Sequence, residues 1–196
     1  MLVFLKVPIE NLIQGISFKP EETVTLTSNN RPEWIHADLA VQMAGGVLVT
    51  IYPTLAADDV RFIINDAQAR FAVVENLTQL EKLPNDSALL PKLEKIVLID
   101  GESDDPRVVT YAHLRQLGNQ TNDAELADRY ENIAPGDIAT IVYTSGTTGR
   151  PKGAMLTQDN FMFISETMLR TFGIHGQDIY LSYLPLSHVY ERFGAF

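Results

Sequence analysis

The chain contains no cysteine among its 196 residues. Disulfide bonds, thiolate metal ligands and a thiol nucleophile are therefore excluded, and an intracellular setting is the default expectation. Basic residues are also scarce, since 15 lysines and arginines stand against 25 aspartates and glutamates, a formal net charge of −10. Binding to nucleic-acid phosphates needs a positive surface, so we predict no nucleic-acid partner.

Long uninterrupted apolar runs are absent as well. Residues 39–57 carry no charge, but Gly45, Gly46 and Pro53 interrupt them. A membrane-crossing helix needs about 20 consecutive apolar residues, so no transmembrane segment is predicted. The apolar residues 1–5 are soon followed by a lysine and a proline without a small-residue cleavage site, and we do not interpret them as a signal peptide.

The composition that remains is that of a globular protein, with 45% hydrophobic and 20% charged residues. Short apolar, mostly β-branched runs predict buried strands over 24–27, 47–51, 71–74 and 95–99. Between them, helices are predicted from Pro32, which suits a first helical position, to Gly45, and over residues 58–66. This alternation predicts an α/β fold with parallel strands.

The second half of the chain continues the pattern. Two short helices are predicted over residues 111–130, a strand over 138–143, a return strand over 153–156, and a helix capped by Thr157. Residues 80–91 and 101–106 are predicted to be polar surface connections. No internal repeat or low-complexity tract divides the chain.

Residues 143–153 read Tyr-Thr-Ser-Gly-Thr-Thr-Gly-Arg-Pro-Lys-Gly and follow the predicted strand 138–143. Glycines allow close approach of the backbone to a ligand, and hydroxyl and amide groups donate to phosphate oxygens. No acidic residue lies between Asp137 and Asp159, so Arg150 and Lys152 make this stretch locally positive. A Ser-Gly pair alone would be typical of a loop that binds nothing. The whole run instead predicts a site for a triphosphate.

A Walker A loop is excluded, because its lysine is followed by Ser or Thr and opens a helix, whereas Lys152 stands between a proline and a glycine. The run instead resembles the phosphate loop of the adenylate-forming, acyl-activating enzymes. The resemblance implies that this loop joins two strands and surrounds the β- and γ-phosphates of ATP. It implies that Thr144 binds Mg²⁺ and that Lys152 neutralises charge as pyrophosphate leaves. The phosphate contacts that it implies come from Ser145, Gly146, Thr147, Thr148 and Gly149.

Two further stretches narrow the resemblance. Residues 184–192, Leu-Pro-Leu-Ser-His-Val-Tyr-Glu-Arg, and residues 30–34 with 45–54 are similar to segments of long-chain fatty-acyl-CoA synthetases. The fold implied is part of a large amino-terminal domain with layered sheets and flanking helices. We assign residues 21–196 to a partial AMP-binding (adenylation) domain, and residues 1–20 to a poorly matched amino-terminal segment.

His188 is the histidine with a predicted role. A lone histidine is usually a core or cap residue, but the resemblance puts this one near the acyl carboxylate and the α-phosphate of ATP. We expect it to orient the substrate, because a fatty carboxylate is already ionised at neutral pH. Lys152 and His188 are thus the predicted catalytic residues, and Tyr190 is a weaker substrate-binding candidate. Glu191 and Arg192 could form a structural pair at the start of a helix.

The function implied is that of a long-chain fatty-acid–CoA ligase, which converts ATP, a fatty acid and coenzyme A to acyl-CoA, AMP and pyrophosphate, with Mg²⁺. A cytoplasmic location is predicted, and the hydrophobic substrate is compatible with peripheral membrane association. The oligomeric state stays open.

Several elements of such enzymes have no candidate before Phe196: the adenine-binding segment, the acidic Mg²⁺ ligand, the ribose-binding aspartate, the hinge and the carboxyl-terminal domain. We therefore expect the chain to be the amino-terminal part of a synthetase, inactive by itself, with exposed apolar surface. Two alternatives stay open. One is another adenylate-forming ligase, such as a coumarate ligase or a peptide-synthetase adenylation domain, against which residues 188–192 weigh. The other is a nucleotide-binding module without catalysis.

Overall fold

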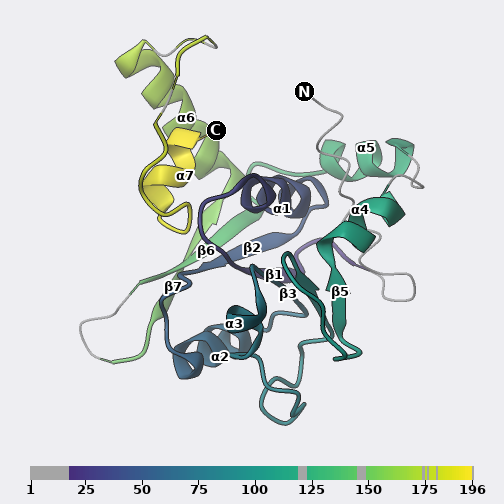
Figure 1. Cartoon of the computed structure of the whole chain (residues 1–196). Helices are drawn as coiled ribbons and strands as arrows, with labels where there is room; N and C mark the ends of the chain where they lie inside the picture. Colours follow the sequence, from purple (N-terminus) through teal and green to yellow (C-terminus); the bar gives the residue numbers. More distant parts are fainter. Residues whose placement is uncertain are drawn as a thin grey trace.

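The computed structural model describes residues 18–118, 123–144, 149–173, 175, 177–179 and 181–195. All strands of these residues belong to one seven-stranded sheet, in the order β5-β4-β3-β1-β2-β6-β7 (Figure 1). Neighbouring strands are parallel except β7, which is antiparallel to β6. The strands are β1 (Thr23–Thr27), β2 (Val47–Ile51), β3 (Phe71–Val74), β4 (Lys95–Leu98), β5 (Val108–Thr110), β6 (Ile138–Thr144) and β7 (Lys152–Thr157).

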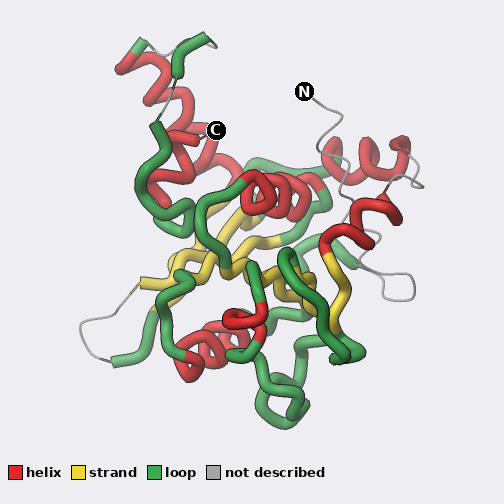
Figure 2. The backbone as a smooth tube through the Cα atoms, viewed as in Figure 1, coloured by secondary structure: helices red, strands yellow, loops and turns green. Residues whose placement is uncertain are grey.

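Helices cover both faces of this sheet, which gives three layers (Figure 2). Helix α1 lies over one face, and α2 and α3 lie over the other (Figure 1). The helices are α1 (Pro32–Met43), α2 (Ala57–Asp66), α3 (Leu77–Leu80), α4 (Tyr111–Gly118), α5 (Asp123–Glu131), α6 (Gln158–Phe172) and α7 (Val189–Ala195). The predicted α/β fold with parallel strands and flanking helices is therefore confirmed.

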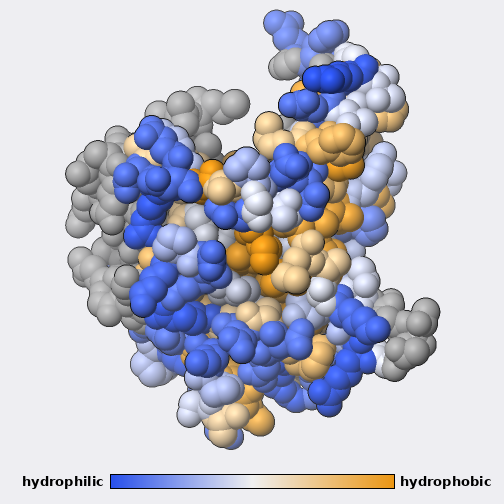
Figure 3. Space-filling view, turned by 180° about the vertical axis from the view of Figure 1, so that it is seen from behind, coloured by the Kyte–Doolittle hydropathy of each residue, from blue (hydrophilic) through white to orange (hydrophobic). Residues whose placement is uncertain are grey.

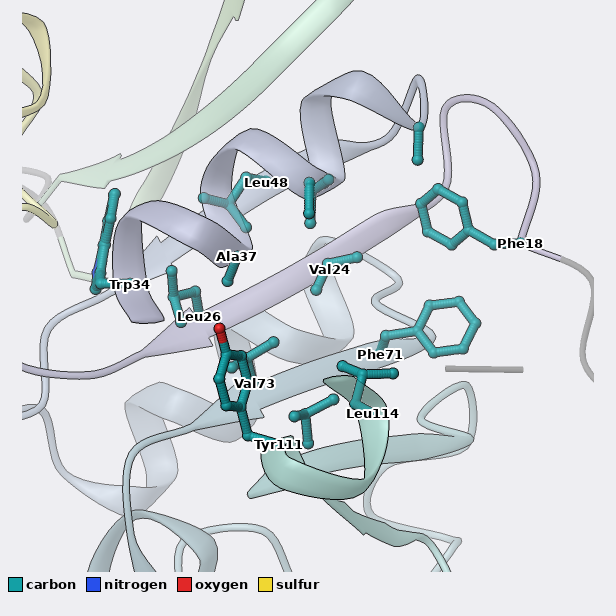
Figure 4. Close-up of a cluster of buried hydrophobic side chains, with 14 of the residues drawn as sticks. Phe18, Val24, Leu26, Trp34, Ala37, Leu48, Phe71, Val73, Tyr111 and Leu114 are labelled. Atoms are coloured by element: carbon teal, nitrogen blue, oxygen red, sulfur yellow. The ribbon is translucent and has the colours of Figure 1, made fainter. Parts of the chain in front are cut away.

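Two buried clusters form the core, one on each face of the sheet. On the α1 face, Trp34 and Ala37 pack with Leu26 and Leu48 from the first two strands (Figure 4). On the α2 face, Ile63 and its helical neighbours pack on the alternate strand residues, among them Val49, Ile51 and Val74. Because the inner strands are buried on both faces, β2, β3 and β4 are mainly apolar along their length, as is usual for parallel sheets, whereas β1 alternates threonine with Val24 and Leu26.

Helix α1 ends in a Schellman motif formed by the two glycines that the sequence placed there. The backbone N–H of Gly46 donates to Val41 O and that of Gly45 donates to Gln42 O, each at 2.9 Å. Gly45 adopts φ +75°, a left-handed conformation that costs an L side chain energy. The motif turns the chain directly into β2.

Three features of the fold were not predicted from the sequence. Helix α3 has only four residues and strand β5 only three half-buried ones, and such short runs show no periodic pattern. The connection predicted to be polar and superficial over residues 80–91 contains Leu83 and Leu90, which are buried in the α2-side cluster. Both leucines are members of that cluster, so this connection is part of the core.

The β6–β7 hairpin contacts α2 through two residues of the glycine-rich run. The Tyr143 hydroxyl donates to Asp66 Oδ2 at 2.6 Å, and the Arg150 guanidinium lies 5.1 Å from the centre of the Phe62 ring. A Cβ atom on Gly153 would lie 2.7 Å from Ile141 Cγ2 and 3.0 Å from the Tyr143 ring. Glycine is therefore required opposite Tyr143.

Exposed apolar side chains are concentrated on α6 and in the segment after it. Met162, Phe163 and Phe172 are at least half exposed, and so are Leu181 and Tyr183. The view from behind shows hydrophobic surface in the middle of the molecule and toward α6 (Figure 3). Within the part of the chain that the structure describes, no helix combines the length and apolarity needed to cross a membrane.

Replacing Gly45 by alanine is expected to lower the free energy of unfolding by about 1–2 kcal/mol, because the side chain must adopt the left-handed conformation. Its Cβ would meet only ordinary contacts, at 3.5 Å or more, so the cost is conformational. Denaturant unfolding measures it, and Gly45→Asn should lose less. Gly136→Ala is the matched control, since no atom lies within 4 Å of the place that its Cβ would take. Equal stabilities for the two alanine variants would contradict the prediction.

Replacing Tyr143 by phenylalanine is expected to cost about 1 kcal/mol at pH 7 through loss of the Asp66 hydrogen bond. Burial, and then the bond to Asp66, raise the pKa of Tyr143 above its usual range. The folded state therefore holds the phenolic proton more tightly than the unfolded state, and this stabilisation is lost as the pH rises above about 10.

Unfolding curves from pH 7 to 11 should accordingly show the parent and Tyr143→Phe converging at high pH. Tyr130→Phe, at a tyrosine with 45% exposure, is the control and should match the parent at pH 7. A constant difference between parent and Tyr143→Phe across this range would refute the assignment.

Candidate functional site

The candidate site lies at the carboxyl edge of the sheet, where β2 and β6 end side by side. These neighbours are parallel, with Thr50 opposite Val142 near their ends. From β2 the chain crosses back over β1 to β3, whereas from β6 it turns outward to β7. Open α/β sheets bind ligands outside the carboxyl ends of strands at points where successive connections diverge.

The two residues on which the sequence-based site depends face each other across the hairpin. Thr144 ends β6, Lys152 begins β7, and the two are paired in register. Directly opposed residues of an antiparallel pair project from the same face, with Cβ atoms about 5 Å apart. Both side chains are exposed. A hydroxyl and an ammonium group are thus presented together at the base of the glycine-rich run.

Thr144 and Lys152 lie on the opposite face of the hairpin from its contacts with α2. Side chains alternate along a strand, so Thr140 and Thr144 project from one face of β6 while Ile141 and Tyr143 project from the other. The latter two pack with the α2-side cluster. Thr144 and Lys152 therefore belong to the face that carries α1.

Part of the predicted phosphate loop is described. Gly149 has φ +128°, a backbone conformation that L side chains rarely adopt, so glycine is favoured there. Ser145, Gly146, Thr147 and Thr148 lie outside the described residues.

Residues 184–188 lie against the end of β2 and are held there by buried polar groups. Thr50 Oγ1 donates to Ser187 O at 3.1 Å, and Ser187 Oγ donates to Ile51 O at 3.4 Å. Asn30 fixes the residues just before, donating from Nδ2 to Leu184 O and accepting at Oδ1 from the Leu186 N–H, both at 2.7 Å. Two of the stretches that carried the family resemblance, residues 184–192 and residues 30–34 with 45–54, are thus in contact.

His188 immediately precedes α7 and is exposed. Its backbone N–H donates to Pro185 O at 2.8 Å, and its ring Nδ1 accepts from the Tyr190 N–H at 3.2 Å. In this arrangement Nδ1 is unprotonated and Nε2 carries the proton, which leaves a donor facing solvent. Tyr190 is 56% exposed beside it.

Arg192 is buried beneath this segment and bound to two other elements. Its Nε donates to Asp38 Oδ2 at 2.6 Å, its Nη2 forms a second short contact with Asp38 Oδ1, and its Nη1 donates to Thr140 Oγ1 at 2.7 Å. The expected pair of neighbours at the start of the helix is replaced by this longer-range pair, and Glu191 accepts a hydrogen bond from the Leu184 N–H.

The sequence analysis did not single out Asp38 or Thr140. One signal was available for Asp38, since it falls on the face of α1 that carries Trp34 and Val41, and both of these are buried. A buried carboxylate requires a positively charged or hydrogen-bonding partner. Nothing in the local sequence names Arg192 as that partner.

Two hollows lie on the opposite face of the sheet. They measure about 510 and 520 Å³, and both border Asp66. The first is also lined by Glu21 and Glu22, and the second by Asp58 and Asp59. Three carboxylates stand against Arg70 and Lys92 in the first hollow and against Arg150 in the second, so the net negative charge of each lining disfavours a triphosphate. The described residues contain no group of three or more acidic, histidine or cysteine side chains that could hold a metal.

Comparison with known proteins identifies the family of the chain. Residues 11–196 match the family model described as AMP-binding enzyme. The chain is 36% identical over 166 residues to the long-chain-fatty-acid–CoA ligase ACSBG2 of Xenopus laevis, a match that covers 82% of this chain and 22% of the relative. It is 38% identical over 176 residues to the peroxisomal long chain acyl-CoA synthetase 6 of Arabidopsis thaliana, covering 83% and 24%. The chain therefore spans about a quarter of the length of these relatives.

Solved structures show the same fold. ATP-bound MatB from Rhodopseudomonas palustris superposes with a TM-score of 0.76 at 24% identity, covering 99% of this chain and 36% of that one. The A-PCP didomain of carboxylic acid reductase from Segniliparus rugosus, in complex with AMP, gives a TM-score of 0.78 at 18% identity, covering 98% and 30%. At these identities the likeness to solved structures shows the fold alone. Membership of a protein family follows instead from the family model that matches residues 11–196. The chain belongs to the family of AMP-binding enzymes.

Proposed function

We propose that this chain supplies the phosphate-binding part of an AMP-forming long-chain fatty-acid–CoA ligase. The observation that carries the proposal is the pairing of Thr144 with Lys152 at the sheet edge where His188 is also held. Relatives at 36–38% identity named as long-chain acyl-CoA ligases or synthetases support the substrate class. We assign residues 21–196 to the partial AMP-binding domain.

Lys152 would bind the β- and γ-phosphates of ATP. Its ammonium group lies in a stretch without acidic residues between Asp137 and Asp159, so its charge is not neutralised nearby in the sequence. Gly149, in its open left-handed conformation, allows the backbone to approach the phosphates. In the reaction, this lysine would stabilise the charge that develops on the departing pyrophosphate.

Thr144 fits Mg²⁺ as one oxygen ligand. Its hydroxyl is exposed at the end of β6, and the described residues offer no set of three metal-binding side chains. Mg²⁺ commonly keeps several waters and is held largely by substrate phosphates, so a single protein hydroxyl is compatible with this ion. When bound, the ion would neutralise charge on the phosphate oxygens.

His188 would donate from Nε2 to an oxygen of the fatty carboxylate or of the α-phosphate. The carboxylate is ionised at neutral pH, so it needs orientation rather than proton abstraction. Tyr190 would contact the acyl group from beside it. The carboxylate then attacks the α-phosphorus, pyrophosphate leaves, and the thiol of coenzyme A displaces AMP to form the thioester. The attacking sulfur belongs to the co-substrate, in agreement with the absence of cysteine.

The remaining expectations stay proposals. ATP, a fatty acid and coenzyme A are the small-molecule partners, and nucleic acid is not a partner. A cytoplasmic location with peripheral membrane association accords with the hydrophobic substrate. A fragment that binds nucleotide without turnover is the second candidate, because the chain covers only 22–24% of its relatives.

Lys152→Ala is expected to weaken Mg-ATP binding at least tenfold, a loss of about 1.4 kcal/mol, because the cation on this face is removed. Isothermal titration calorimetry on the chain measures it. Lys92→Ala is the matched control, since this lysine borders the hollow on the opposite face. Equal weakening by both substitutions would mean that general charge, and not the Thr144–Lys152 pair, governs binding.

The chain alone is expected to show no palmitate-dependent exchange of pyrophosphate into ATP. This polypeptide corresponds to only 22–24% of the length of its relatives, so the groups that the remainder of such an enzyme contributes to positioning the reactants are missing from the assay. A full-length relative, such as the Arabidopsis thaliana synthetase, serves as the positive control. Exchange above background by this polypeptide would overturn the expectation and establish an active enzyme.

A further inference from the structure

The geometry points to Arg192 as a positioning residue: bound to Asp38 and Thr140, it fixes the ring of His188 so that Nε2 is the donor at the phosphate-binding face. What that donor serves rests on the proposed function. The positioning itself is a property of the chain without ligand and can be tested separately.

The guanidinium group of Arg192 has no freedom to move. Its side chain is 1% exposed and that of Asp38 is 0% exposed. It makes two contacts with Asp38 and one with Thr140, so each of its three nitrogen atoms has a directed partner. The rings of Phe161 and Trp34 lie 4.9 and 5.8 Å from its central carbon.

Asp38 and Thr140 are themselves held in place. Asp38 Oδ1 also accepts from Gln42 Nε2 at 2.8 Å, one turn further along α1. The Thr140 hydroxyl donates to Leu48 O at 2.5 Å, which leaves its lone pairs to accept from Arg192. The network thus joins α1, β2 and β6 to α7.

Arg192 reaches His188 through one turn of α7. The Arg192 N–H donates to His188 O at 3.2 Å, and residues four apart lie on the same side of a helix. Fixing Arg192 therefore fixes the rotation of α7, and with it the direction of the Tyr190 N–H that donates to His188 Nδ1. The residues that precede His188 are fixed as well, because Asn30 donates to Leu184 O and Ser187 Oγ donates to Ile51 O.

The same network also fixes the position of His188 relative to the phosphate-binding hairpin. Thr140 and Thr144 lie on the same face of β6, four residues or about 13 Å apart along the strand. One guanidinium group is therefore attached both to the helix that orients His188 and to the strand that ends at Thr144. Because Asp38 balances its charge, Arg192 acts through geometry rather than through its field.

A purely structural role makes a different prediction from a positioning role. A buried ion pair can often be replaced by apolar residues of similar volume without loss of stability. The double variant Asp38→Leu/Arg192→Met should then fold, yet it lacks the fork that sets the rotation of α7. Arg192→Lys keeps the charge but cannot form three directed hydrogen bonds.

The test is the tautomer of His188, read from the ¹⁵N imidazole signals of the ligand-free chain at a pH where the ring is neutral. His188→Gln assigns the signal among the four histidines. We expect the parent to show the Nε2–H tautomer alone. The double variant is expected to show a mixture of both tautomers, and Arg192→Lys an intermediate mixture.

The control is Glu166→Leu/Arg170→Met, which removes an exposed ion pair from α6 in the same way. It should leave the His188 signal unchanged. A mixture of tautomers in the parent would overturn the proposal, whether or not any variant folds. So would a parent-like signal in the folded double variant or in Arg192→Lys.

Mg-ATP binding separates this proposal from the proposed function. If the parent binds Mg-ATP, the double variant should bind several-fold more weakly. If the parent does not bind it, the proposed function fails, while the tautomer still decides the role of Arg192.

Discussion

The ion pair between Asp38 and Arg192 is the interaction on which the candidate site depends. It joins residues 154 positions apart in the sequence, and neither side chain has access to water. A buried carboxylate or guanidinium without its partner is costly, so α1 and α7 are each incomplete without the other. Residues 184–188 are held at the end of β2 as part of the same arrangement.

Most of the fold could be predicted from local signals. Apolar β-branched runs marked β1 to β4, Pro32 and the Gly45–Gly46 pair marked the ends of α1, and Thr157 proved to be the first member of a capping box with Asn160. Strand β5 was not predicted, because its three residues, although β-branched, are too few to show a periodic pattern, and only pairing with β4 defines the strand. The burial of Leu83 likewise depends on a cluster assembled from distant segments.

The candidate site, like the fold, was predicted only in part from the sequence. The composition of residues 143–153 indicated a phosphate site that includes Lys152, and the family resemblance implied a role for Thr144. Their common face follows from the register, which only the paired strands define. Asp38 and Thr140 escaped notice because an aspartate in a helix and a threonine in a strand are ordinary until their shared partner is known. The roles of these residues in binding and catalysis stay predictions.

The glycine at position 153 has a mechanical consequence. The Tyr143 ring and Ile141 fill the space that a side chain would take there, and the Tyr143 hydroxyl is bonded to Asp66 at the end of α2. The hairpin and α2 are therefore joined through the Tyr143 side chain, so a change of the bend at the base of the hairpin would displace the ring and, through Asp66, the end of α2. Asn65, the next residue back, donates to Leu89 O at 2.8 Å, so the displacement would reach the far connection between α3 and β4.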